Sequence, residues 1–224
     1  LNILRCIAYY NDIRNGLLRP PLDARTVIFG GKAAPAYKMA KLIIELINRV
    51  GNVINNDPKV KDFLTIQFIP NYGVSLAEII IPASDISQQI STAGTEASGT
   101  GNMKFAINGA ITIGTMDGAN IEIREEVGTE NIYIFGLTSD EINALKESGM
   151  YNPVSYYERS KKLKDAIDLI TSGHFYKNDV HRFDPITNSL LKAGDPFMIC
   201  ADFNSYYECH SRVLAQYQKK DIWT

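Results

Sequence analysis

The sequence is poor in cysteine and lacks an excess of either charge, and both shortages narrow what the protein can be. Its 224 residues include three cysteines, Cys6, Cys200 and Cys209, with no Cys-x-x-Cys pair. We therefore expect no disulfide framework, and a reducing compartment, the cytoplasm, fits better. Lysine and arginine total 23 against 25 acidic residues, for a net charge of −2. This balance argues against a nucleic-acid partner, which usually requires a basic excess.

The chain also has no long hydrophobic run. A membrane span needs about 20 apolar residues, whereas the apolar stretch 77–83 is already interrupted by Glu78 and Pro82. We therefore expect no membrane partner. Hydrophobic residues still make up 45% of the chain and charged residues only 21%. That composition is enough for a buried core and is unlike a disordered chain.

Apolar runs and helical periodicity alternate along the sequence. Buried strands are predicted over 25–31, 63–69, 110–114 and 131–135. Helices are predicted over 1–14, 35–51, 75–81, 139–146, 155–172 and 203–218. Pro35 is expected in a first helical turn, Gly51 as a helix stop, and Ser139 or Asp140 as an N-cap. This alternation, with no linker, predicts one Rossmann-like three-layer α/β domain over 1–224 with a mainly parallel sheet.

Residues 87–120 differ from the rest of the chain. They hold six of the 16 glycines and only three charged residues, Glu96, Lys104 and Asp117. Such a stretch has few side chains to bury, but its backbone can approach a ligand closely. A P-loop would need lysine at Thr100, and a dinucleotide fingerprint would need glycine at Lys104, so neither motif is present.

What remains is Gly99-Thr-Gly-Asn-Met-Lys104, which leads into a possible helix start. Backbone N–H groups there and the Thr100 hydroxyl predict an anion cradle. An imine-forming lysine must lose its proton, and the apolar neighbours Met103, Phe105 and Ile107 disfavour its charged form. A phosphate cradle beside a nucleophilic lysine describes a pyridoxal-phosphate site. A plain surface loop with an exposed lysine is the alternative.

Residues 90–122 read ISTAGTEASGTGNMKFAINGAITIGTMDGANIE and closely resemble the cofactor segment of the glycogen (α-glucan) phosphorylases. The segments 30–35, 71–72 and 74–78 are similar to the same family in the same order. The resemblance covers essentially the whole chain. It implies the C-terminal Rossmann-like domain of a two-domain enzyme with the glycosyltransferase-B fold, without the N-terminal domain and the C-terminal tail.

The resemblance also implies site residues and a reaction. Lys104 matches the lysine that holds pyridoxal phosphate as an imine. The turn beside the cofactor's phosphate is matched by Gly99, Thr100 and Gly101, and Tyr72 matches a residue near its ring. The strip that binds the hydroxyls of the transferred glucose is matched by Glu96, Ala97, Ser98 and Gly99. The implied reaction is the phosphorolysis of α-1,4-glucan by inorganic phosphate to glucose 1-phosphate, with retention, in a homodimeric full-length enzyme.

In this family the cofactor's 5′-phosphate, rather than its ring, takes part in proton transfer. The departures are a missing basic segment upstream of Leu1 and Gly73 in place of an arginine of animal members. The fragment alone is therefore expected to be inactive. A nucleotide-sugar glycosyltransferase of the same fold and a non-catalytic glucan-binding domain stay open as alternatives.

The remaining polar residues give weaker signals. Three histidines, His174, His181 and His210, do not form a metal-ligand pattern, so no metal site is expected. Lys32 follows two glycines at the end of a predicted strand. Because ligands gather at the carboxyl ends of strands in α/β sheets, it is expected either to face a ligand or to be a plain surface lysine.

Overall fold

A computed structural model describes residues 1–18, 24–96 and 98–219. The chain divides into two compact units, and each is described by itself. Unit 1 consists of Leu1–Gly73 and Tyr157–Gly194, and unit 2 of Val74–Tyr156 and Asp195–Thr224. The single domain predicted over 1–224 stays a prediction.

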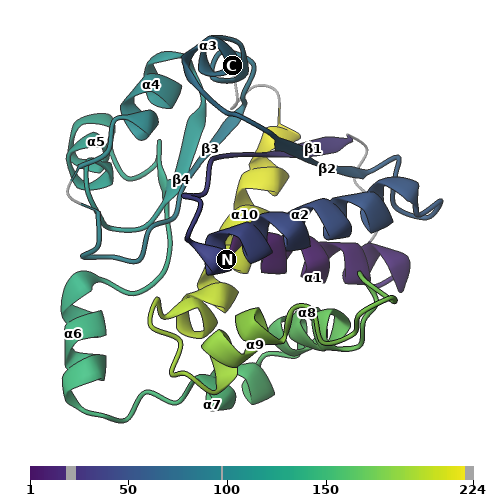
Figure 1. Ribbon diagram of the computed structural model, residues 1–224. Helices are drawn as coiled ribbons and strands as arrows, with labels where there is room; N and C mark the ends of the chain where they lie inside the picture. Colours follow the sequence, from purple (N-terminus) through teal and green to yellow (C-terminus); the bar gives the residue numbers. More distant parts are fainter. Residues whose placement is uncertain (19–23, 97, 220–224) are drawn as a thin grey trace. The chain divides into compact units, whose positions relative to one another are not determined.

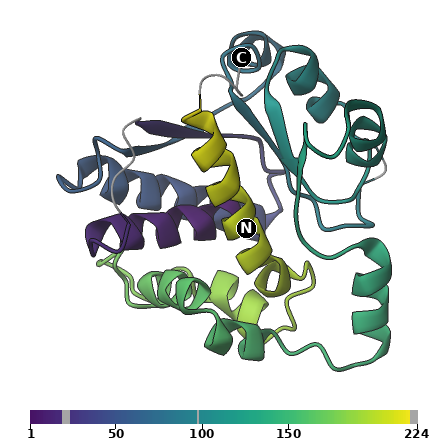
Figure 2. The same ribbon diagram turned by 180° about the vertical axis from the view of Figure 1, so that it is seen from behind.

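Unit 1 is built around a pair of parallel strands. Its elements are α1 (Asn2–Arg14), β1 (Arg25–Gly30), α2 (Lys38–Asn56), β2 (Leu64–Ile69), α8 (Lys161–Thr171) and α9 (Asp184–Leu191). The two strands pair in register from Arg25 opposite Leu64 to Gly30 opposite Ile69, with α2 as the crossover. This is the predicted βαβ unit. The largely buried helix α1 lies between α2 and α8 (Figure 1 and Figure 2).

The predicted bounds of the crossover helix are wrong at both ends. It begins at Lys38 rather than near Pro35, and it continues through Gly51 to Asn56. A Cβ at Gly51 would lie 3.0 Å from the Ile66 carbonyl oxygen. Asn55 binds the same strand residue, donating to the Ile66 carbonyl and accepting from its N–H, both at 2.9 Å. Gly51 therefore lets the helix pack closely on β2 instead of ending it.

Unit 2 contains a second parallel sheet, in the order β3-β4-β5. Its elements are α3 (Val74–Ile80), β3 (Ile86–Gln89), α4 (Gly101–Ile107), β4 (Ile111–Gly114), α5 (Asn120–Val127), β5 (Tyr133–Ile134), α6 (Ser139–Glu147) and α10 (Ile199–Tyr217). The short helix α7 (Pro153–Arg159) crosses the boundary between the units in sequence. All described strand pairs are parallel, which confirms the predicted α/β class with a mainly parallel sheet.

Three predicted helices need correction. The N-cap of α6 is Thr138, whose hydroxyl accepts from the Glu141 N–H while the Glu141 carboxylate accepts from the Thr138 N–H. The segment 155–172 is two helices, because Ser160 interrupts it and caps α8 by accepting from the Leu163 N–H. The last helix begins at Ile199 rather than at 203. Strand β3 and helices α5 and α9 were not predicted.

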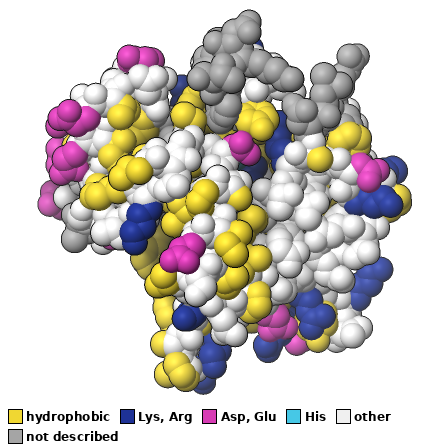
Figure 3. Space-filling view, turned by 90° about the horizontal axis from the view of Figure 1, so that it is seen from above, with side chains coloured by type: hydrophobic (Ala, Val, Ile, Leu, Met, Phe, Trp, Pro, Cys, Tyr) yellow, Lys and Arg dark blue, Asp and Glu magenta, His cyan; other side chains and the backbone are white. Residues whose placement is uncertain are grey.

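Apolar side chains are not confined to the interior. Val74 and Ile79 on α3, and Met103 and Ile107 on α4, are exposed. The face drawn in Figure 3 carries hydrophobic patches, in yellow, among polar and charged side chains. Within the described ranges, no helix combines the length and the apolar character that crossing a bilayer requires.

Candidate functional site

The predicted sugar and phosphate residues lie on loops that follow two neighbouring strands of unit 2. Residues 90–100 join β3 to α4, and residues 115–119 join β4 to α5. Because β3 and β4 are parallel neighbours, both loops leave the same edge of the sheet (Figure 1). The carboxyl ends of strands are where ligands bind in open α/β sheets.

The carboxylate of Asp117 organises the first loop. One oxygen accepts from the Gly94 N–H at 2.9 Å, and the other accepts from the N–H groups of Thr95 at 3.2 Å and Glu96 at 2.8 Å. Asp117 is only 7% exposed. A buried carboxylate needs such donors to offset its lost hydration, and here three backbone groups of the loop supply them.

Glu96 extends outward from this anchored segment. Its side chain is exposed, and its Oε2 accepts a hydrogen bond from the Ser91 hydroxyl at 3.3 Å. Gly118 lies against it, since a Cβ there would be 3.2 Å from Glu96 Cγ. Ser98 and Gly99 follow on the same loop, and Gly99 has a φ of +78° that suits glycine. Ala97 lies outside the described residues.

A network of side-chain amides supports the start of α4. Buried Asn102 donates to Asn120 Oδ1 at 3.1 Å. Asn120 in turn donates to the Thr115 carbonyl at 3.0 Å and to the Gln89 carbonyl at 3.3 Å. The amides tie the first turns of α4 and α5 to the ends of β3 and β4.

Lys104 lies one turn into α4 and is exposed. Thr100 is the N-cap, yet its side chain makes no capping bond, so the hydroxyl is left for another partner. Of the three apolar neighbours expected for Lys104, Met103 is 39% and Ile107 is 85% exposed, because the short helix turns both outward, while Phe105 is half-buried. Within the described part of the chain, no acceptor or carboxylate binds the Lys104 ammonium.

The hollow between the two loops is small. It measures about 50 Å³ and is lined by Gln89, Ser91, Glu96, Ser98, Gly99, Asn102, Thr115, Asp117 and Asn120. Ligand pockets usually measure about 300–1,000 Å³, so this hollow is too small to enclose a ligand by itself. A hollow of about 530 Å³ lies elsewhere in unit 2, where Arg124, Tyr133 and Arg212 contribute to its lining. None of the predicted site residues lines that hollow.

Tyr72 belongs to unit 1, on the turn after β2. Its ring packs on Gly30 at the end of β1, where a Cβ would lie 2.8 Å from Tyr72 Cδ2. The Lys32 ammonium lies near Gly73, 3.9 Å from the position of a Cβ there. The structure thus gathers Tyr72 and Lys32 at the ends of β1 and β2, while an approach of Tyr72 to Lys104 stays a prediction.

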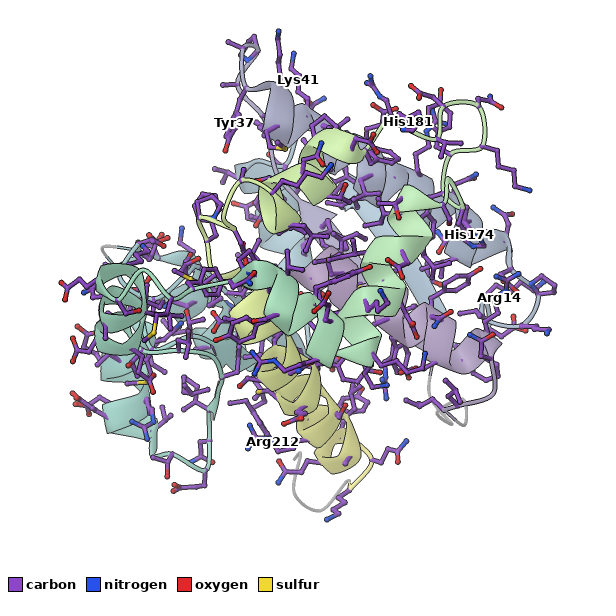
Figure 4. The ribbon with its side chains drawn as sticks, turned by 90° about the horizontal axis from the view of Figure 1, so that it is seen from below. Arg14, Tyr37, Lys41, His174, His181 and Arg212 are labelled. Carbon is purple, nitrogen blue, oxygen red and sulfur yellow. The ribbon has the colours of Figure 1, made fainter. Side chains whose placement is uncertain are left out.

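His174 and His181 belong to unit 1, and His210 belongs to unit 2 on helix α10. His174 Nε2 is 3.1 Å from the Tyr10 hydroxyl, which donates to Asp57, and Arg14 contacts the same carboxylate on that side of unit 1 (Figure 4). Burial, followed by the charges of Arg14 and Lys177, lowers the pKa of His174. His181 pairs instead with Asp184 at 2.9 Å.

Sequence reasoning assigned no role to Asp117, Ser91, Asn102, Thr115 or Asn120, although all lie in the quoted segment. Asp117 carried a signal, because it is one of only three charged residues in 87–120. The amides and hydroxyls carried none, since such residues are also common in loops that bind nothing.

The fold and the two loops define an α/β protein with a polar surface at the carboxyl edge of a parallel sheet. A family model described as Carbohydrate phosphorylase matches residues 1–224. The chain belongs to the carbohydrate phosphorylase family.

Individual relatives agree. The chain is 54% identical over 224 residues to a glycogen phosphorylase of Chlamydia trachomatis serovar D, covering 100% of this chain and 27% of that protein. It is 52% identical to a glycogen phosphorylase of Synechocystis sp. and 51% identical to the brain form of Homo sapiens, covering 100% of this chain and 26% of each relative. The chain thus spans about a quarter of the length of these relatives.

Proposed function

We propose that this chain forms part of a pyridoxal-phosphate-dependent α-glucan phosphorylase. The reaction is phosphorolysis of an α-1,4-glucan, glycogen or maltodextrin, by inorganic phosphate to glucose 1-phosphate. The proposal is supported by membership of the family and by the names of the relatives. The observation that supports it most directly is the exposed carboxylate of Glu96. It lies on the loop that leads to Thr100, the N-cap of the helix that contains Lys104.

The residues of this loop and helix are compatible with the cofactor. Lys104 has an exposed amine, so an aldehyde can reach it. Thr100 keeps its hydroxyl free of a capping bond, and Gly99 and Gly101 add no side chain beside it. Lys104 would hold the cofactor covalently, and Gly99, Thr100 and Gly101 would contact its phosphate. When bound, pyridoxal phosphate supplies a phosphate group whose second pKa of about 6 suits proton transfer at neutral pH.

The sugar side of the site uses Glu96, Ala97, Ser98 and Gly99. Glucose hydroxyls need both acceptors and donors, and a single carboxylate next to backbone N–H groups and a hydroxyl offers both. The Ser91 hydroxyl donates to only one oxygen of the Glu96 carboxylate. The other oxygen would accept a hydrogen bond from a sugar hydroxyl. Tyr72 would pack near the cofactor ring, and a homodimer is the expected assembly of the full-length enzyme.

Covalent labelling tests the central assignment. A full-length phosphorylase that carries this chain is loaded with pyridoxal phosphate, reduced with borohydride, and mapped by peptide mass spectrometry. We expect the pyridoxyl group on Lys104, its loss in Lys104→Arg, and its retention in the matched control Lys32→Arg. A label on Lys32 with Lys104 unmodified overturns the assignment. The absence of any label favours a nucleotide-sugar glycosyltransferase or a non-catalytic glucan-binding domain instead.

A further inference from the structure

The loop that carries Glu96 is fixed at both ends by the neighbouring loop. At its start, the Thr115 hydroxyl donates to the Ser91 carbonyl at 2.6 Å. Near its end, the Ala119 N–H donates to the Ser98 carbonyl at 2.9 Å. Between these two points, the consecutive backbone N–H groups of residues 94–96 all donate to the Asp117 carboxylate, and the Thr95 N–H is shared with the Thr92 carbonyl at 3.0 Å.

The position of Glu96 is therefore set by the position of Asp117. The Glu96 N–H makes the shortest of the three bonds to that carboxylate, at 2.8 Å. The Asp117 side chain is buried, and both of its oxygens are already used by the backbone. Asp117 is thus placed to act on a ligand through Glu96 rather than by touching it.

The same bonds decide which ligand groups suit this part of the loop. The N–H groups of Gly94, Thr95 and Glu96 point at a carboxylate, so they are not available to a phosphate. A phosphate placed there would also meet the negative charges of Asp117 and Glu96. Neutral hydroxyls meet no such repulsion, and they can donate to the Glu96 carboxylate.

We infer that Asp117 is a positioning residue for sugar recognition, which fixes the Glu96 carboxylate and reserves residues 94–96 for uncharged hydroxyls. The inference rests on the proposed function. Asp117→Asn keeps the shape of the side chain but removes the negative charge, and it turns an N–H₂ group toward a backbone N–H. We expect kcat/KM for glucan phosphorolysis to fall about 10- to 100-fold, with the content of pyridoxal phosphate unchanged.

A double-mutant cycle separates positioning from a general loss of structure. In a full-length phosphorylase that carries this chain, Asp117→Asn is measured alone and in a Glu96→Gln background. If Asp117 acts through Glu96, its effect in that background shrinks to about 3-fold or less. An equal loss in both backgrounds overturns the inference.

Asp202→Asn is the matched control. Asp202 is another buried carboxylate of unit 2 that accepts a backbone N–H, that of Leu137 at 2.8 Å, and it makes no bond to residues 94–96. We expect this variant to keep its kcat/KM. A loss as large as that of Asp117→Asn means that any buried carboxylate has the same effect, and this outcome also contradicts the inference. If Asp117→Asn does not fold, Asp117→Glu keeps the charge but moves it by one methylene, and it takes the same place in the cycle.

Amide hydrogen exchange of a peptide that covers residues 90–100 gives a readout without activity. Exchange in this peptide should quicken in Asp117→Asn and stay unchanged in Asp202→Asn. If the wild-type enzyme releases no glucose 1-phosphate, the proposed function fails, and exchange alone then decides whether Asp117 holds the loop. Unchanged exchange in Asp117→Asn overturns the inference whatever the activity.

Discussion

Gly118 offers a direct test of how the two loops fit together. Its φ is +50°, and a Cβ there would lie 2.5 Å from the Ser98 carbonyl oxygen and 3.2 Å from Glu96 Cγ. The first of these contacts is to backbone, so a methyl group cannot be accommodated by rotating a side chain. We expect Gly118→Ala to push the Ser98 carbonyl away from its donor, the Ala119 N–H, and to displace Glu96.

The matched control is Gly149→Ala. Gly149 has a φ of +64° and no atom within 4 Å of its Cβ position. An alanine in left-handed backbone destabilises the folded state by about 1–2 kcal/mol. Replacing glycine by alanine also reduces the entropy of the unfolded chain, which stabilises the protein by about 0.4–1 kcal/mol. The free energy of unfolding of the control should therefore fall by about 0–1.6 kcal/mol. Gly118→Ala shares this strain and also loses one hydrogen bond, which is worth about 0.5–1.5 kcal/mol.

The assay is thermal and denaturant unfolding of the wild type and both variants under the same conditions. Moving the Ser98 carbonyl out of the clash costs more than the lost hydrogen bond alone. We therefore expect Gly118→Ala to be about 1–2 kcal/mol less stable than Gly149→Ala. For a chain of this size, that difference lowers Tm by about 2–8 °C. Equal stability of the two variants would show that the contact between Gly118 and Ser98 is not present in solution.

Two further predictions concern carboxylates. In the full-length enzyme, Glu96→Gln should lower kcat/KM about 10- to 100-fold, because a charged hydrogen bond is worth about 1.5–3 kcal/mol. The absorbance of the cofactor should not change. An unaltered kcat/KM would show that Glu96 does not touch the sugar. Burial raises the pKa of Asp202 to about 6. The folded state therefore holds a proton more tightly than the unfolded state, whose pKa is about 3.9, and the stability gained at low pH is lost as pH rises through about 6. Between pH 4 and pH 7 the wild type should lose up to about 3 kcal/mol relative to Asp202→Asn, and a difference in unfolding free energy that is independent of pH contradicts this.

Much of the fold was predictable because apolar pattern and secondary structure agree in it. Strand 63–69 is an apolar run, and strand β2 covers Leu64–Ile69. Strand β3 was missed because Ser87, Gln88 and Gln89 replace such a run. These polar groups are satisfied inside unit 2, where Gln89 donates to Ser87 at 2.7 Å and Tyr206 donates to Gln88. The bond between Tyr206 and Gln88 joins residues 118 positions apart, so no local pattern reveals it.

The remaining elements were missed for local reasons. Helix α5 buries a single residue, Asn120, and therefore has no apolar stripe to detect. Helix α9 did carry a signal, since Asp184 and Pro185 are typical of a first helical turn. In the site, the spacing of glycine and threonine indicated the loop before Lys104. The local sequence pattern does not show, however, which side chains of the short helix after this loop are exposed. The exposure of Met103 and Ile107, two of the three apolar neighbours named for Lys104, could not be predicted for that reason.

The composition of the loop explains why a carboxylate anchors it. Residues 91–100 contain no large apolar side chain, so burial of apolar surface cannot fix their shape. Their backbone N–H groups need acceptors. Within residues 94–96 the loop itself supplies one, the Thr92 carbonyl, which accepts from the Thr95 N–H at 3.0 Å. An aspartate on the next loop offers two oxygens to three consecutive donors, whereas an asparagine would offer one. The charge that holds residues 94–96 also repels anions from them. This segment is therefore held in a way that favours a neutral, hydroxyl-rich ligand over a phosphate, while Gly99 and Thr100 lie outside it.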